Sequence, residues 1–463
     1  MPRDVPTPSP PRAAATLERR LGPLDAAAIV ISNVIGGGIF YVPVIIAQMA
    51  PHGAAMLLVW VLGGGLAFAG AMAYAELAAV RPRAGGEYVY LRDAFGPLAA
   101  FLTGWTSFVA GFSGAIAAGA VALADYVGRF VPAAANSTPI FVVPIPGLPL
   151  IVSPRAVVAI VAITALSLIH MRGLGPGSFV QNVLAATKVT ALVVFVALGF
   201  ALGSGSMAHV QGGGTFPVEG LLLALVPVMF SYSGWNAAAY VAEEVRDPGR
   251  NVPLALGLGT VAVVIIYVAL NALYLYALPI AELAALPDGR LVDTVAERLF
   301  GFTAGNVLAL FTIVSISASI SAMVLAGPRV YYAMARDGMF LPRAATVHAQ
   351  FRTPASAIVA QAVWSSVLVL CGTLSQLVSY TGFAVVLFAG VAVAALFVLR
   401  RREREAPRHF RAWGYPWAPA IFIAASAAMV ANEIVRNGAT ALVGLAVIGT
   451  GVPVYYLFAK HHR

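Results

Sequence analysis

A single lysine lies inside an apolar stretch of the chain, where a charged side chain needs polar partners. Lys188 is deep in the apolar run 178–203, so its ammonium group is too far from either end to reach water easily. A lysine at the centre of a bilayer costs about 2.5–3.5 kcal/mol on insertion scales. We therefore expect Lys188 to face the protein interior and to bind carbonyl oxygens and hydroxyl groups there.

Serine hydroxyls and main-chain carbonyls are the partners that the sequence offers to Lys188. The apolar run 303–335 has a serine at every second position between 315 and 321, and Ser317 and Ser321 share one face of a helix. We predict that these two serines, with carbonyls freed by a break in the first apolar run, hold the ammonium group. Two roles fit this burial equally: a permanently charged tether between helices, and a group that gains and loses a proton during the working cycle.

Two apolar runs contain flexible residues in their middles, where we predict that a helix is interrupted. The first run holds three consecutive glycines, Gly36, Gly37 and Gly38, each of which costs about 1 kcal/mol in a helix interior relative to alanine. The other interrupted run, 218–244, holds the segment Phe230–Asn236, with small polar residues and a glycine. In lipid, unwound backbone persists only where it is buried in protein or lines a polar cavity.

Interrupted helices expose main-chain groups of both signs. Half-helix N-termini attract an anionic group such as a carboxylate, and free carbonyls at the other half-ends attract a cation such as an ammonium. A zwitterionic α-amino acid carries both groups. Close helix packing is the alternative explanation for a run of glycines, and we prefer it for Gly63–Gly65. For Gly36–Gly38 the matching break five helices later favours a binding site, because that spacing is typical of an inverted repeat.

Other kinds of chemistry leave no recognisable pattern in the sequence. There is no G-x-x-x-x-G-K-[ST] segment, so we do not expect ATP to be the energy source. The His and Cys residues are too scattered for a metal site, and we predict neither a metal nor a cofactor. An H-E-x-x-H motif, a G-x-S-x-G motif and a mid-membrane Asp pair are also missing, so we expect a protein that is not an enzyme. The single cysteine, Cys371, allows no internal disulfide.

The composition indicates the kind of structure that holds these residues. The chain has 463 residues, of which 60% are hydrophobic and 10% charged, whereas soluble domains carry about 25% charged residues. We predict an all-α membrane protein with twelve transmembrane helices, since a membrane helix needs about 20 mostly apolar residues. The predicted helices lie near 25–50, 54–79, 97–131, 155–171, 178–203, 218–244, 253–279, 303–335, 355–373, 376–399, 415–435 and 438–459.

The basic residues predict the orientation of these helices. With the N-terminus inside, most of the 28 Lys and Arg residues fall on the cytosolic side, as the positive-inside rule requires. The formal charge of +9 therefore reflects topology and contact with anionic lipid rather than binding of nucleic acid. We predict a disordered cytosolic tail over residues 1–21, ending in an amphipathic lead-in at Leu17–Leu21, and a second cytosolic tail at 460–463.

Several carboxylates lie at the predicted helix ends. Glu243, Glu244 and Asp247 follow the sixth helix; they either pair with cytosolic arginines in a gate or, as we prefer, form a solvated helix end. Glu76 and Asp25 leave the same two alternatives open. The middles of the first, third, sixth, eighth and tenth predicted helices contain no Asp or Glu. This disfavours a cationic amine as the substrate, because a buried charge needs a partner of opposite sign.

Together these residues resemble the amino acid–polyamine–organocation superfamily of transporters, and most of all its L-amino-acid transporter and bacterial permease group. The resemblance extends over residues 20–459, and it is carried by the segments Ile35–Phe40, Phe230–Asn236, Glu243–Pro248, Arg250–Pro253, Arg336–Gly338 and Gly414–Pro416. It implies a LeuT-type fold with residues 22–459 as a single transporter domain. Two inverted repeats of five helices (25–203 and 218–399), with helices 1 and 6 broken, would precede two C-terminal helices (415–459).

The resemblance also implies alternating access for amino acids and a substrate site at the two breaks. The amides of Gly36–Gly38 would bind the substrate carboxylate. Carbonyls at both breaks would take the amino group, namely those near Val34, Ile35, Phe230 and Ser233. Ser231 belongs to the same segment, and Asn236 would lie beside the side-chain pocket.

Aromatic residues and the buried lysine have further implied roles. Phe230 matches the gating aromatic of the family, and Tyr232 and Trp235 are candidate caps over the substrate, with packing as their alternative. Lys188 matches a fifth-helix lysine whose ammonium substitutes for the sodium ion of sodium-coupled relatives. The resemblance therefore argues against sodium coupling.

We therefore predict a sodium-independent transporter of neutral L-amino acids that works by exchange or by proton coupling. Gly37 stands where many members have serine, which removes one hydroxyl contact. Animal members attach to a heavy chain through a cysteine between helices three and four; this chain has none there, so we expect no disulfide-linked partner. The preference for arginine and the short tails suggest a bacterial inner-membrane protein. A polyamine or organic-amine carrier is the alternative within transport, and an amino-acid-binding sensor or channel is the alternative from another class.

Overall fold

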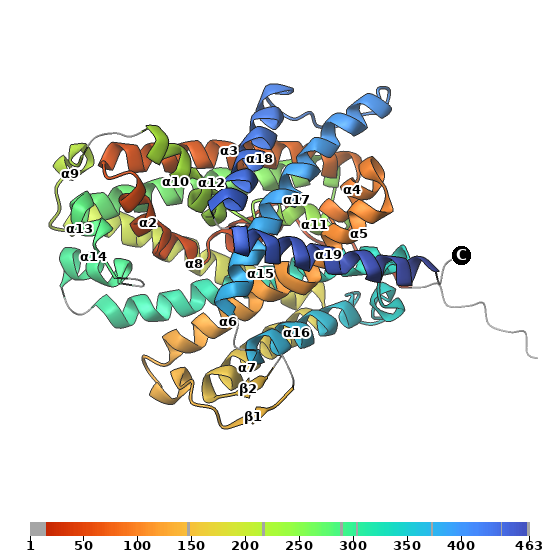
Figure 1. Cartoon of the computed structure of the whole chain (residues 1–463), viewed down its shortest axis with the longest axis horizontal. Coiled ribbons are helices and arrows are strands. Elements are labelled where there is room, and N and C mark those ends of the chain that lie inside the picture. Colours follow the sequence, from red (N-terminus) through yellow and green to blue (C-terminus); the bar gives the residue numbers. More distant parts are fainter. Residues whose placement is uncertain are drawn as a thin grey trace, which may run out of the picture.

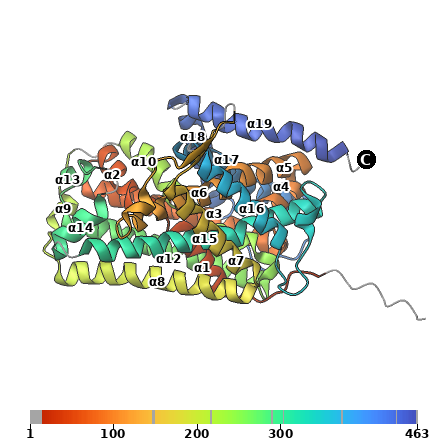
Figure 2. The same cartoon turned by 90° about the horizontal axis from the view of Figure 1, so that it is seen from below.

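The computed structural model describes residues 15–145, 149–214, 218–287, 290–301, 304–371, 374–436 and 438–460. This part of the chain is mostly helical, and its long helices pack into one bundle (Figures 1 and 2). Within it, one hairpin breaks the helical pattern: β1 (Phe141–Val143) pairs antiparallel with β2 (Leu150–Val152) between two long helices. Apart from this hairpin, the prediction of an all-helical protein is confirmed.

The first half of the chain supplies long apolar helices and several short connecting turns. Its helical elements are α1 (Pro23–Val34), η1 (Gly38–Phe40), α2 (Val42–Met49), α3 (Gly53–Val80), α4 (Glu87–Phe95), α5 (Pro97–Thr106), the π-helical turn η2 (Ser107–Gly111), α6 (Phe112–Val127), η3 (Pro132–Ala135), α7 (Pro154–Met171), α8 (Leu174–Leu202) and α9 (Ala208–Gln211).

The second half repeats this mixture of long and short helices. Its elements are α10 (Val218–Ser231), α11 (Ala237–Tyr240), η4 (Ala242–Glu244), α12 (Pro248–Ala277), α13 (Ile280–Ala284), α14 (Leu291–Phe300), α15 (Ala304–Arg336), η5 (Pro342–Ala345), α16 (Ala355–Leu370), α17 (Leu374–Arg402), α18 (Trp417–Arg436) and α19 (Gly438–Lys460).

Many of these helices have the length and composition of membrane spans. In the described ranges, nine helical segments are long and apolar enough to cross a membrane, and α1 and α16 are shorter apolar helices. One of the nine is continuous from Pro97 to Val127 through the π-helical turn. The chain is therefore a multi-pass membrane protein. Its arrangement as twelve spanning helices with two inverted repeats stays a prediction.

Two helices are interrupted where the sequence predicts it. α1 ends at Val34, and helix resumes only in η1 and α2. α10 ends at Ser231, and α11 begins at Ala237. Between them the main chain leaves helical geometry, most clearly at Gly234, whose φ of +99° favours glycine because a side chain would clash there.

The glycine triplet in α3 serves helix packing. A Cβ atom on Gly63 would lie 2.3 Å from Val228 Cγ1 of α10, and one on Gly64 would lie 2.7 Å from Val264 Cγ2 of α12. Gly65 faces open space. The packing explanation is therefore confirmed at the first two positions, where small residues let the backbones approach closely.

The segment before α1 is held against the turn that follows α11. The main-chain N–H groups of Arg20 and Leu21 both donate to the Glu244 carbonyl at 2.9 Å, and the Leu21 side chain is buried. Residues 15–21, which we predicted as part of a disordered tail, thus have defined contacts at Leu21. Residues 1–14 of that predicted tail lie outside the described residues.

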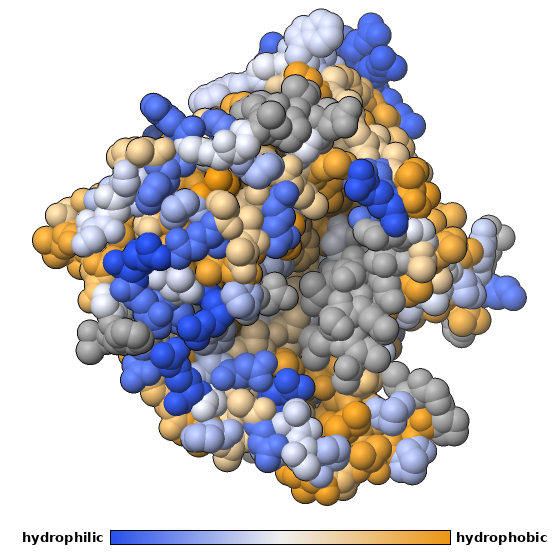
Figure 3. Space-filling view, turned by 60° about the vertical axis from the view of Figure 1, so that its left-hand side comes forward, coloured by the Kyte–Doolittle hydropathy of each residue, from blue (hydrophilic) through white to orange (hydrophobic). Residues whose placement is uncertain are grey.

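The surface divides into apolar and hydrophilic regions. Apolar side chains are exposed along the outer helices, for example Val161 of α7, Phe179 of α8 and Ile265 of α12, as contact with lipid requires. Hydrophilic residues gather toward the end of the molecule where α9, α13 and α14 lie (Figures 1 and 3). This division is typical of a bundle whose ends leave the bilayer.

Candidate functional site

A cavity of about 400 Å³ lies at the two helix interruptions. Parts of α1, α6, α10, α15 and α17 form its wall, and small or apolar residues dominate the lining. Within the described part of the wall, Glu87 carries the only carboxylate. The cavity brings together most of the predicted substrate-site residues, namely Val34, Gly36, Gly37, Gly38, Phe230, Ser231, Ser233 and Asn236.

The two interruptions contact each other directly. The side-chain amide of Asn33 donates to the Gly234 carbonyl at 3.4 Å, and a Cβ atom on Gly234 would lie 2.8 Å from that amide nitrogen. A Cβ atom on Gly38 would come within 3.0 Å of the Ser231 hydroxyl. Glycine at both positions therefore permits a close approach that a larger residue would prevent.

A tyrosine of α12 connects the ends of the two broken helices. The Tyr267 hydroxyl lies 3.0 Å from the carbonyl oxygen of Val34, at the end of α1, and 3.2 Å from that of Ser231, at the end of α10. The hydroxyl has one hydrogen to donate. It can therefore satisfy either of the two carbonyls, which lie at the last turns of their helices.

The unwound segment after α1 presents main-chain N–H groups near the cavity. η1 begins at Gly38, and the first N–H groups of a helical turn have no acceptor within that turn. Such groups favour an anion such as a carboxylate. No described atom lies within 4 Å of a Cβ placed on Gly37, so a ligand has room to approach the main chain at this residue.

Lys188 is fully buried in α8, and it binds the end of α1. Its Nζ atom donates to the Ile35 carbonyl, to the Ser32 carbonyl at 3.3 Å, and to the Ser319 hydroxyl at 3.1 Å. An ammonium group has three hydrogens, and these three acceptors match them. The predicted carbonyl partners at the first break are therefore confirmed.

The hydroxyl partner of Lys188 is Ser319 of α15, and not Ser317 or Ser321 as predicted. Ser317 donates to the Ile313 carbonyl at 2.8 Å in its own helix. Ser321 lies 2.8 Å from His170 Nε2 of α7. The prediction grouped the serines into faces correctly, but it chose the wrong face, because only the packing of α15 against α1 decides which face meets the lysine.

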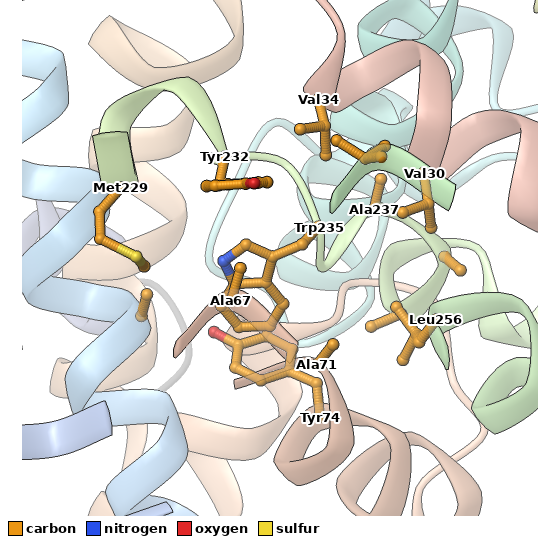
Figure 4. Close-up of a cluster of buried hydrophobic side chains, with 14 of the residues drawn as sticks. Val30, Val34, Ala67, Ala71, Tyr74, Met229, Tyr232, Trp235, Ala237 and Leu256 are labelled. Atoms are coloured by element: carbon orange, nitrogen blue, oxygen red, sulfur yellow. The ribbon is translucent and has the colours of Figure 1, made fainter. Parts of the chain in front are cut away.

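Of the three candidate gating aromatics, only Phe230 lines the cavity. Tyr232 is buried in the core, and its hydroxyl donates to the Trp60 carbonyl at 3.1 Å. Trp235 packs edge-on against Tyr74, with 4.8 Å between the ring centroids (Figure 4). Neither ring lines the cavity, and packing, the alternative, describes the contacts of both. Their role as caps over the substrate stays a prediction.

Glu87 is a cavity residue that the sequence reasoning missed. It is the first residue of α4, a short helix outside the apolar spans, and its side chain is buried. Oε1 of its carboxylate accepts a hydrogen bond from the Tyr74 hydroxyl at 2.6 Å and from Asn236 Nδ2 at 2.7 Å. Burial is the main cause that raises the pKa of Glu87 above its ordinary value. The one local signal was Gly85-Gly86 before an acidic residue, which allows the sharp turn that brings α4 to the cavity.

Ion pairs stabilise the chain beyond α11. Glu244 accepts two hydrogen bonds from the Arg329 guanidinium, at 2.7 and 2.9 Å, and both side chains are buried. Oε1 of Glu243 lies 3.1 Å from a guanidinium nitrogen of Arg336. Arg336 and Arg329 both belong to α15. The preferred prediction, a solvated helix end, is therefore wrong for Glu244, because η4 folds back against α15 and excludes water from the pair.

For Glu76 and Asp25 the sequence left the same two alternatives, an ion pair in a gate and a solvated helix end. The structure gives the two residues different partners. Glu76 is buried at the end of α3 and pairs with Arg400, and with Arg408 at 3.2 Å. Asp25 instead accepts a hydrogen bond from Asn182 at 2.6 Å and one from the Gly22 main chain at 2.7 Å. Glu76 thus belongs to an ion-pair cluster, whereas Asp25 caps the start of α1.

Two touching helix interruptions that line a cavity inside a bundle of membrane-spanning helices define a class of protein: a membrane transporter with discontinuous helices, whose exposed main-chain groups bind the substrate. Comparison with known families specifies the class further. The chain belongs to the amino acid permease family, whose sequence profile matches residues 21–458. The resemblance to the amino acid–polyamine–organocation superfamily is thereby confirmed.

Known relatives cover nearly the whole chain. It is 29% identical to the serine/threonine exchanger SteT of Bacillus subtilis (strain 168) over 452 residues, which are 96% of this chain and 98% of the relative. It is 28% identical to the large neutral amino acids transporter small subunit 2 of Homo sapiens over 448 residues, 95% and 80% of the two chains. It is 27% identical to the b(0,+)-type amino acid transporter 1 of Mus musculus over 451 residues, 96% and 89%.

Proposed function

We propose that this protein is a secondary active transporter of neutral L-amino acids that works by alternating access. The observation that carries the proposal is the pair of helix interruptions that touch at Asn33 and Gly234 and line one cavity. Family membership supports transport, and the names of two relatives, a serine/threonine exchanger and a transporter of large neutral amino acids, support neutral substrates.

The substrate would lie across the two interruptions. Its carboxylate would bind the N–H groups of Gly37 and Gly38, where the first turn of η1 begins, whereas the N–H of Gly36 already donates to the Val34 carbonyl at 2.8 Å. Its ammonium would bind the carbonyls of Val34 and Ser231, which share the single Tyr267 hydroxyl. The Ile35 carbonyl is excluded from this set, because Lys188 already binds it.

The position of Lys188 supports the proposal of sodium independence. Carbonyl oxygens at the end of a half-helix are typical ligands of a coupling sodium ion. Here the carbonyls of Ser32 and Ile35 and the hydroxyl of Ser319 surround an ammonium group instead. We infer that the fixed ammonium group of Lys188 holds the broken helix in place. A sodium ion has this role in other transporters.

The membrane arrangement that we propose has two inverted repeats of five helices, 25–203 and 218–399, followed by two C-terminal helices. Both termini would face the cytosol of a cell whose inner membrane holds the protein, because the basic residues gather on that side. The Glu244–Arg329 pair would then form part of the inner gate below the cavity. We expect no disulfide-linked partner chain.

Uptake into proteoliposomes tests the proposal. We expect tritiated L-alanine, L-serine, L-threonine or L-leucine to enter vesicles that contain the same amino acid unlabelled, at equal rates in sodium and in choline chloride. Protein-free vesicles are the control. Failure of all these amino acids to enter above that control would refute the function, and a requirement for sodium would refute the role given to Lys188.

An organic-amine carrier is the second candidate, because a carboxylate does lie in the cavity wall. The predicted helices have no carboxylate at mid-depth, whereas Glu87 reaches the cavity from α4, outside those helices. Uptake of tritiated putrescine in the same vesicles separates the two candidates. Putrescine uptake that Glu87→Gln abolishes, without neutral amino acid uptake, would favour the amine carrier.

A further inference from the structure

A carboxylate in the cavity wall has no role in the binding of a neutral amino acid as described above. Glu87 is buried, it lines the cavity, and it lies in a short helix outside the apolar spans. We propose that the Glu87 carboxylate binds and releases one proton in each transport cycle, so that amino acid movement is coupled to proton movement. This inference rests on the proposed transport function and adds a coupling ion to it.

The groups that contact this carboxylate are neutral donors. Tyr74 of α3 donates to it at 2.6 Å, and Asn236 donates at 2.7 Å. The same Asn236 amide lies 3.0 Å from the hydroxyl of Tyr240 in α11, which also faces Glu87. Among the described residues, no arginine, lysine or histidine forms an ion pair with it. The charge on Glu87 is therefore not fixed by a salt bridge, and it depends on access of water.

The charged groups on the elements around Glu87 have other partners. Tyr90 is a further ionisable group nearby on α4, and α5 contributes no ionisable side chain. On α3, α4, α15 and α17, and at their ends, the charged groups form the pairs Arg81–Asp93, Arg92–Asp337, Arg329–Glu244, Arg336–Glu243 and Arg400–Glu76. Arg401 and Arg402, at the end of α17, are exposed. Desolvation without a cationic partner favours the neutral acid. It raises the pKa of Glu87, although hydrogen bonds from Tyr74, Tyr240 and Asn236 oppose this change.

Asn236 connects the proton to the substrate site. It lies two residues beyond Gly234, whose carbonyl binds Asn33 at the first interruption. A closed, dry wall favours the protonated acid, whereas water that enters an open cavity favours the carboxylate. The charged form also accepts stronger hydrogen bonds from Asn236 than the neutral form does. Protonation of Glu87 therefore changes the strength with which α4 holds α11, next to the break that binds substrate.

Lys188 is another buried ionisable group near the site, and its contacts suit a constant charge. Its three acceptors, two of them carbonyls of α1, match the three hydrogens of an ammonium group. Loss of a proton would leave two hydrogens for the two carbonyls and would require the Ser319 hydroxyl to donate to Nζ instead of accepting from it, so the contacts as they stand fit the charged form. The tether and the proton carrier, which the sequence left as alternatives for one lysine, are thus divided between Lys188 and Glu87.

Proton movement driven by substrate tests the inference. The full chain is reconstituted in vesicles that contain the pH dye pyranine, and a mixture of L-alanine, L-serine, L-threonine and L-leucine is added outside, with parallel uptake of the tritiated forms. We expect the wild type to move protons with amino acids and to show a pH-dependent rate. Glu87→Gln is expected to lose both properties while it still exchanges labelled amino acid. Glu282→Gln, at an exposed ion pair with Arg298, is expected to keep both.

A second variant makes the test independent of the activity of Glu87→Gln. Tyr74→Phe removes a donor to the charged carboxylate, so the midpoint of the pH profile is expected to shift to higher pH. A structural role alone would lower the rate at every pH and leave the midpoint in place. Wild-type exchange without proton movement, proton movement by Glu87→Gln, or an unshifted midpoint in Tyr74→Phe would each overturn the inference. Absence of amino acid uptake by the wild type would instead refute the proposed function.

Discussion

Replacement of Lys188 by methionine removes the cation that holds the end of α1 and keeps most of the side-chain volume. The carbonyls of Ser32 and Ile35 would then share the one hydroxyl hydrogen of Ser319, whose Oγ atom lies 2.9 and 3.0 Å from the two carbonyl oxygens. One buried carbonyl is left without a donor, at about 1–3 kcal/mol. If the missing hydrogen bond destabilises only the conformation that binds substrate, the affinity for amino acid decreases roughly 5- to 150-fold.

Thermal unfolding in detergent and uptake in proteoliposomes measure the two parts of this effect. We expect Lys188→Met to unfold at a lower temperature and to lose most uptake. Lys188→Ala should be less stable still, because it also leaves a cavity. Ser319→Ala combined with Lys188→Met should cost less than the sum of the single changes, since the three groups form one network.

Ser317→Ala is the matched control, because Ser317 lies on α15 with Ser319, and among the described residues its hydroxyl donates to Ile313 of that helix. It should leave uptake unchanged. Wild-type uptake by Lys188→Met, with an unchanged unfolding temperature, would refute the reasoning. Such a result would show that the lysine is neither a tether nor a carrier of protons.

The remaining predictions concern the ion pair and the glycines. Glu244→Gln should destabilise the fold by roughly 3–5 kcal/mol in a denaturant titration, because it leaves the Arg329 charge buried without a partner; the double change with Arg329→Met should recover part of this loss, and no recovery would contradict the assignment. Gly234→Ala should abolish uptake, since its φ is +99°, whereas Gly65→Ala in open space should be silent; equal uptake by the two would be contrary evidence. Gly37→Ser should fold normally, because no described atom lies near a Cβ there, and should change the order of preferred amino acids in competition assays; an unchanged order would place residue 37 away from the substrate.

The sequence was sufficient for features that depend on local properties of one helix. Hydrophobic runs located the long apolar helices, and glycines located the interruptions after Val34 and after Ser231. The cost of burying an isolated lysine in lipid was enough to predict that Lys188 binds carbonyls of the first break. Each of these conclusions follows from the bilayer as a solvent, and none requires knowledge of how helices pack.

Features that depend on packing could not be predicted. The choice of Ser319 over Ser317 depends on how α15 is rotated about its axis against α1. Trp235 and Phe230 lie in one short segment, yet only the second faces the cavity, because the direction of a side chain in unwound backbone has no simple period.

Glu87 illustrates the same limit at larger scale. In the sequence it lies in a polar stretch between two apolar runs, which is the usual appearance of a surface loop. The structure places it in the cavity wall because α4 packs beside Tyr74 of α3 and Asn236 of the broken helix. Its partners are separated from it by 13 and 149 positions in the chain, so no local pattern links them.

The Tyr267 hydroxyl has a consequence for the energy of the empty site. The Val34 carbonyl already accepts the main-chain N–H of Gly36 at 2.8 Å, so the one hydrogen of Tyr267 is available for the Ser231 carbonyl. Both carbonyls therefore have a donor before any substrate arrives, and each keeps a second lone pair for an ammonium group. The vacant protein would then be preorganised, and the amino acid would add hydrogen bonds to a main chain that is already held in place.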